Sequence, residues 1–234
     1  MSDAPQITRE VLLTQLREAV GAAHVLTDDQ ATRRFRKGHR TGEGPVLAVV
    51  RPGTLLEQWK VLQAAVAADR IVIMQAANTG LTGGSTPDGS GYDREIVLIN
   101  TLRIAGVQVV RGGEQVVCLP GATLDRLEQT LIPFNREPHS VIGSSCIGAS
   151  VLGGICNNSG GALVRRGPAY TELALYARVR DDGTLELVNH LGIALGQTPE
   201  DILTRLQNGS YTEADVHHEP ERAASDAQIG RAHV

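Results

Sequence analysis

The sequence predicts an α+β fold of two subdomains with an N-terminal helical appendage. Three observations lead to this prediction: apolar residues at helical spacing near the N-terminus, a strand–helix–strand run that ends in a glycine-rich loop, and two later pairs of short strands joined by glycine-containing turns. We place the subdomains at about residues 45–105 and 106–213.

The first predicted element is an amphipathic helix from Thr8, a good N-cap residue, through Val20, with Gly21 just past its end. Its apolar face holds Leu12, Leu16 and Ala19. We assign residues 1–41 to this N-terminal helical segment and residues 42–213 to the main domain.

The first subdomain begins with a strand at Val46–Arg51. Thr54 and Glu57 then form a capping-box pattern at the start of a helix. The apolar positions of this helix are Leu56, Trp59, Leu62 and Val66. Strands at Ile71–Gln75 and Glu95–Asn100 follow, and the first of these completes a β-α-β unit.

The second subdomain reads as short strands and helices separated by turn residues. We expect paired strands at Val107–Val110 and Gln115–Leu119 around Gly112–Gly113, a helix at Leu124–Leu131, a hairpin of Glu172–Arg180 and Thr184–Asn189 about Asp182–Gly183, and a helix starting at Thr198–Pro199.

A charge-free loop of small residues, Gln75–Pro87, directly follows the second strand of the β-α-β unit. Small side chains let the backbone approach an anion, and successive N–H groups can form a concave donor array. The loop lacks the Gly-Lys-Ser/Thr of a P-loop and the G-x-G-x-x-G of a Rossmann fold. It therefore suits a pyrophosphate of another dinucleotide-binding type, and a plain connection between strands is the alternative.

A second glycine-rich stretch, Ser140–Val164, contains no charged residue. A spanning helix needs about 20 predominantly apolar residues, and this stretch has too many glycines and hydroxyls for that. It suits backbone packed against a flat ligand with polar edges. Two such segments in one domain indicate one extended ligand.

Four motifs in order resemble a known family over about Arg36 to His218. They are Pro52–Gly53 after a strand, Gln75–Gly80, Gly83–Pro87 and Arg136–Gly161. The family they resemble is that of the respiratory, quinone-linked D-lactate dehydrogenases of bacteria. These flavoproteins carry the FAD-binding domain shared by vanillyl-alcohol oxidase and p-cresol methylhydroxylase.

The resemblance implies non-covalent FAD, bound between the two subdomains. The first loop inherits contacts to the pyrophosphate at Ala76, Ala77, Asn78, Thr79, Gly80, Gly84 and Ser85, and the second segment inherits contacts to the rest of the cofactor at Gly143, Ser150 and Gly160. No catalytic base and no arginine for a substrate carboxylate can be assigned, because in the family these groups belong to a later substrate domain.

The resemblance also implies an activity: oxidation of D-lactate to pyruvate, with electrons passed to a membrane quinone by a peripheral enzyme on the cytoplasmic side of the bacterial inner membrane. We expect a truncated chain that is itself soluble, with an artefactual tail at 214–234 and membrane association through missing parts. Two alternatives stay open: the FAD domain of another 2-hydroxy-acid dehydrogenase or oxidase, and an FAD-binding fragment without catalysis.

Composition excludes other classes of function. The net charge of −4 gives no electrostatic reason to expect binding to nucleic acid. The first residues do not have the hydrophobic pattern of a signal peptide. The basic residues within 33–40 favour a solvated face, with contact to anionic lipid as the alternative. The cysteines, Cys118, Cys146 and Cys156, form no C-x-x-C pair, so we expect buried free thiols and no metal site.

Overall fold

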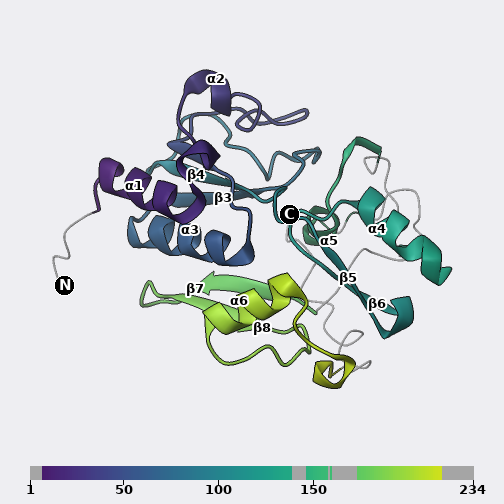
Figure 1. The fold of residues 1–234 in the computed structure, drawn as a ribbon. Coiled ribbons are helices and arrows are strands. Elements are labelled where there is room, and N and C mark those ends of the chain that lie inside the picture. The colour runs from purple at the N-terminus through teal and green to yellow at the C-terminus, as the bar shows by residue number, and fades with distance from the viewer. Residues whose placement is uncertain (1–6, 139–145, 158, 160–172, 218–234) are drawn as a thin grey trace. The chain divides into compact units, whose positions relative to one another are not determined.

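The computed structural model describes residues 7–138, 146–157, 159 and 173–217 (Figure 1). By its internal contacts the chain divides into two units, residues 1–103 with 179–185 and residues 104–178 with 186–234. The break after residue 103 lies close to the predicted subdomain boundary. The wider domain bounds, including the tail, stay a prediction.

The first unit is built on a four-stranded sheet with the order β1-β2-β4-β3. β1 (Val25–Leu26) pairs antiparallel with β2 (Ala48–Val50), whereas β4 (Ile96–Asn100) pairs in parallel with both β2 and β3 (Ile71–Gln75). The predicted β-α-β unit is therefore confirmed, with β4 lying between its two strands. Because three strands are parallel, the loops that follow them leave from the same edge of the sheet.

The predicted N-terminal helix is confirmed as α1 (Arg9–Val20), with Thr8 as its N-cap. Its packing goes beyond the appendage that we expected, because Leu12 and Leu16 are fully buried in one core with the sheet and α3 (Leu55–Ala67). The amphipathic pattern shows that a helix has a covered face, but not what covers it. α1 is an integral layer of the first unit.

The helix α3 is covered on more than one side. Its most buried residues are Leu55, Trp59, Val61 and Ala65. Of the four apolar positions that the sequence predicts for this helix, Trp59 is buried, whereas Leu56, Leu62 and Val66 are half-buried. The shift arises because α3 packs against both the sheet and α1, so no single helical stripe describes its interface. Thr54 caps the helix as predicted, and its hydroxyl accepts from the N–H of Glu57 at 3.1 Å.

The second unit contains two separate two-stranded sheets and three helices among its described residues. Its elements are β5 (Val107–Val110), β6 (Gln115–Cys118), α4 (Leu124–Leu131), α5 (Val151–Cys156), β7 (Leu175–Val179), β8 (Leu185–Asn189) and α6 (Pro199–Asn208). Both predicted strand pairs and both predicted helices are confirmed within a residue or a few residues of their bounds. In the first unit, α2 (Asp29–Thr32) completes the helices.

The turns within the two strand pairs need glycine where they were expected to, although residues 179–185 of the β7–β8 turn group with the first unit. Gly112 and Gly113, between β5 and β6, have φ of +60° and +88°, and Gly183 in the β7–β8 turn has φ of +81°. These left-handed conformations cost an L-residue energy that glycine avoids. α4 packs its buried leucines with Ala149 and Val151 in a small core of its own.

Candidate functional site

The predicted pyrophosphate loop follows β3 at the carboxyl edge of the parallel strands (Figure 1). We call residues 76–85 the glycine loop. It holds seven of the residues predicted to contact FAD, so the structure keeps Ala76, Ala77, Asn78, Thr79, Gly80, Gly84 and Ser85 together in one segment.

The backbone N–H groups of the glycine loop have no acceptor among the residues that the structure describes. From Ala76 to Ser85, none of them donates a hydrogen bond to another group in the part of the chain that the structure describes. Backbone donors that the protein leaves free can serve an anion, and a diphosphate offers several acceptor oxygens. Free donors of this kind would suit a dinucleotide site, and a plain connection between strands stays the alternative.

Two glycines of the loop face open space. A Cβ atom added at Gly80 or Gly84 would meet no other atom within 4 Å, and neither residue has the positive φ seen at Gly83 (+77°). Neither packing nor backbone conformation therefore requires glycine at these two positions. Their small size leaves room for a ligand to approach the backbone closely, which fits the diphosphate of FAD.

Two buried amide side chains lie where the glycine loop begins. Gln75 ends β3, Asn100 ends β4, and the two are paired in the sheet register. The Nε2 of Gln75 donates to the carbonyls of Phe35 (2.7 Å) and Ser85 (2.8 Å). The Nδ2 of Asn100 donates to Gln75 Oε1 (3.2 Å) and to the carbonyl of Ala76 (2.9 Å).

We did not single out these two amides from the sequence. A signal was present, since two apolar strands each end in an amide, Ile-Val-Ile-Met-Gln and Ile-Val-Leu-Ile-Asn. A buried amide needs partners for its donors and acceptor, so such a residue indicates a built hydrogen-bond network.

Asn78 holds the loop from within. Its φ is +55°, a left-handed conformation that asparagine tolerates better than most residues. Its Nδ2 donates to the carbonyl of Lys37 at 2.8 Å, and its Oδ1 accepts from the hydroxyl of Ser85 at 2.8 Å. The side chains of Asn78 and Ser85 thus shape the loop, and their backbone N–H groups stay free for a ligand.

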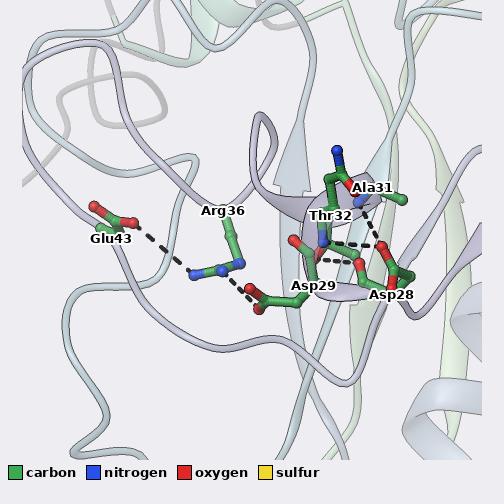
Figure 2. Close-up of polar contacts among 7 residues, drawn as sticks. Asp28, Asp29, Ala31, Thr32, Arg36 and Glu43 are labelled. Carbon is green, nitrogen blue, oxygen red and sulfur yellow. Dashed lines mark hydrogen bonds and ion pairs between the residues drawn. The ribbon is translucent and has the colours of Figure 1, made fainter.

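Phe35 and Lys37, whose carbonyls accept bonds from Gln75 and Asn78, flank Arg36, and Arg36 is held by ion pairs (Figure 2). Arg36 Nη2 lies 2.6 Å from Asp29 Oδ1, and Arg36 Nη1 lies 3.9 Å from Glu43 Oε1. The expected solvated face holds for Arg33, Arg34, Lys37 and Arg40, which are exposed. Arg36 is the exception in this run, since its side chain is only 16% exposed.

Within the second glycine-rich stretch, the structure describes Ser150 but neither Gly143 nor Gly160, which lie outside the described residues. Ser150 is 5% exposed and caps α5, its hydroxyl accepting from the N–H of Gly153 at 3.0 Å. A hydroxyl that accepts this bond still has its own O–H to donate. Ser150 belongs to the second unit, and the glycine loop belongs to the first.

The three cysteines form no disulfide, and they differ in burial. Cys118 is half-buried, and burial raises the pKa of its thiol to about 11. The expectation of burial is wrong for Cys146 and Cys156, which are exposed. An apolar or glycine-rich neighbourhood in the sequence does not determine which side chains cover a cysteine in the fold. Among the described residues, His, Cys, Asp and Glu gather in no group that could hold a metal ion.

None of the helices in the described ranges has the length and apolar character needed to cross a bilayer.

The family of the chain follows from a match to the FAD binding domain over residues 46–188, more than half of the sequence. The chain belongs to this family, and FAD is its cofactor. The glycine loop lies within the matched residues.

Among curated relatives, the chain is similar to the quinone-dependent D-lactate dehydrogenases of Haemophilus influenzae and Escherichia coli. It is 62% identical to the first over 208 residues, 89% of this chain and 37% of that protein. It is 58% identical to the second over 223 residues, 95% of this chain and 39% of that protein. The chain thus spans less than two fifths of the length of these relatives.

Solved structures agree on the fold at low sequence identity. p-Cresol methylhydroxylase has a TM-score of 0.56 at 12% identity, over 81% of this chain and 36% of its own. Alkyldihydroxyacetonephosphate synthase has a TM-score of 0.63 at 17% identity, over 87% of this chain and 38% of its own. The predicted α+β fold of the vanillyl-alcohol oxidase and p-cresol methylhydroxylase type is confirmed.

Proposed function

We propose that this chain supplies the FAD-binding part of a quinone-dependent D-lactate dehydrogenase, which oxidises D-lactate to pyruvate and passes the electrons to a membrane quinone. The identity of 58–62% to relatives of that name supports the reaction. The observation in the structure that carries the FAD role is the run of backbone N–H groups from Ala76 to Ser85 that donate to no other group in the described ranges.

In this proposal the glycine loop binds the diphosphate of FAD. Its N–H groups donate to the phosphate oxygens, and charge-assisted bonds of this kind are stronger than neutral ones. Gly80 and Gly84 let the phosphates come close because no side chain stands between them and the backbone. Gly143, Ser150 and Gly160 bind the rest of the non-covalent cofactor.

The flavin supplies the redox chemistry by accepting a hydride from the 2-hydroxy acid. The residues of this chain position the cofactor, and we assign no catalytic base among them. Peripheral association with the cytoplasmic side of the bacterial inner membrane belongs to the same proposal, since a quinone acceptor lies in the membrane. The quinone dependence in the names of the relatives supports the membrane association, and the resemblance to the family supports the side.

The test is the visible absorption spectrum of the purified chain before and after addition of FAD, followed by D-lactate under anaerobic conditions. We expect a bound-flavin spectrum that D-lactate does not bleach, because the catalytic groups have not been found among these residues. Bleaching would place them here after all. A folded chain that takes up no FAD would contradict the proposal that these residues suffice for binding.

The same assay separates the alternatives in a full-length protein. Bleaching by D-lactate and reoxidation by a quinone analogue, faster than by oxygen, supports the dehydrogenase. Bleaching by another 2-hydroxy acid, or preferential reoxidation by oxygen, indicates a related oxidase. A full-length protein that binds FAD without bleaching by any 2-hydroxy acid indicates a flavin-binding module.

A further inference from the structure

The ends of β3 and β4 carry two amides that the interior hides almost completely. Gln75 is 3% exposed and Asn100 is 2% exposed, and they are neighbours in the sheet. Buried amides are costly unless their hydrogen-bonding groups are satisfied. What satisfies them here is the glycine loop and the segment beside it.

Gln75 links the two ends of the glycine loop by a hydrogen bond. Its Nε2 donates to the carbonyl of Ser85, ten residues further along the chain, so one side chain joins the beginning of the loop to its end. The second N–H of the Gln75 amide donates to the carbonyl of Phe35, which joins the start of the glycine loop to the segment that contains Phe35. Asn100 adds a bond to the carbonyl of Ala76, the first residue of the loop.

Neither amide has a donor left for a ligand. Both N–H groups of Gln75 are used, and its Oε1 accepts from Asn100. Both N–H groups of Asn100 are used by Gln75 and Ala76, and its Oδ1 lies 3.4 Å from the N–H of Leu102. These residues must therefore act through the loop and not by contact with the cofactor.

We propose that Gln75 and Asn100 are positioning residues, a clamp that holds the glycine loop in its FAD-binding shape before FAD arrives. The proposal rests on the proposed FAD role of the loop. Within the described residues the N–H groups of the loop make no bonds, and the Asn78–Ser85 side-chain bond is internal to the loop but does not tie it to the sheet. The clamp joins both ends of the loop to β3 and β4, so it sets the fraction of molecules that can bind. Apparent affinity falls in proportion to that fraction.

The test compares Gln75→Met with a matched control, Gln108→Met in the second unit. Gln108 also makes two tertiary bonds, donating to the carbonyl of Leu206 at 2.7 Å and accepting from Tyr211 Oη at 2.6 Å. Both variants lose hydrogen bonds of similar kind, and only one of them touches the loop. Asn100→Ala serves as a second clamp variant in case Gln75→Met does not fold.

Two measurements are made on folded protein. The first is the dissociation constant of FAD by flavin fluorescence: we expect about tenfold weaker binding, through slower association, for the clamp variants and no change for Gln108→Met. The second needs no FAD: the rate of thermolysin cleavage before Leu81, which is 55% exposed. We expect it to rise about tenfold in the clamp variants only.

Unchanged cleavage before Leu81 in a folded clamp variant would overturn the proposal, whatever the chain does with FAD. Equal FAD affinity in the clamp variants, in Gln108→Met and in the unmodified chain would do so as well, even if all variants lose stability. If the unmodified chain itself takes up no FAD, the proposed FAD role of this chain fails, and the cleavage rates still decide whether the clamp orders the loop.

Discussion

The substitution Gly84→Val should weaken FAD binding without lowering the stability of the fold. A Cβ atom there meets no protein atom within 4 Å, and Gly84 lacks a positive φ, so Gly84→Val should leave the stability of the chain nearly unchanged. The diphosphate would lose its close approach. If the side chain displaces two phosphate oxygens from their N–H donors, at about 1.5–3 kcal/mol for each bond to a charged group, the loss is about 3–6 kcal/mol.

That loss corresponds to FAD binding weaker by a factor of about 10² to 10⁴. Gly91→Val is the control, because Gly91 is also exposed, also has open space around its Cβ position and lies outside the glycine loop. The assay is titration with FAD, with thermal unfolding measured on the same samples. Equal FAD affinity of Gly84→Val and Gly91→Val would refute a diphosphate at this loop.

Three further predictions concern the framework. Leu16→Ala should lower the free energy of unfolding by about 2–5 kcal/mol, since the side chain is fully buried; a loss below about 1 kcal/mol in denaturant titration would mean that α1 is dispensable. Arg36→Gln should cost about 0.5–1 kcal/mol in the same titration through the loss of its ion pair with Asp29, whose side chain is 89% exposed, and an unchanged midpoint would show that the pair contributes nothing. At pH 8 the Cys118 thiol, whose pKa of about 11 keeps it protonated, should react with a maleimide far more slowly than Cys146, which is exposed. Labelling of Cys118 should become faster as the pH rises towards its pKa of about 11. Mass spectrometry of labelled peptides after a timed pulse distinguishes the two cysteines.

The sequence was sufficient wherever a signal is local. Thr123 caps α4 and Thr198 caps α6, and both helices begin where a hydroxyl followed by helix formers predicts a start. The bounds of β3 were predicted because an apolar run is bordered by a charged residue and a loop of small residues. The glycine loop could be predicted for the same reason.

The sequence was insufficient where the partner is distant. Gln75 and Phe35 are 40 residues apart, and no periodicity records that the amide of one meets the carbonyl of the other. The same limit applies to α3, whose two covered sides depend on α1, and to Cys146, whose exposure depends on which side chains surround it. Each of these features is set by tertiary packing, which overrides a local pattern.

The FAD role that we propose for the glycine loop would need such distant contacts. A segment that keeps its N–H groups free for a ligand gives up the hydrogen bonds that would otherwise fix its backbone. Ordering each residue costs about 1–2 kcal/mol of conformational entropy, so a free loop would bind FAD at the expense of that ordering. The bonds that order it must then come from side chains outside the run of donors. Gln75 and Asn100 supply such bonds from outside the loop. Asn78 supplies another through its side-chain amide, while its backbone N–H stays available to a ligand.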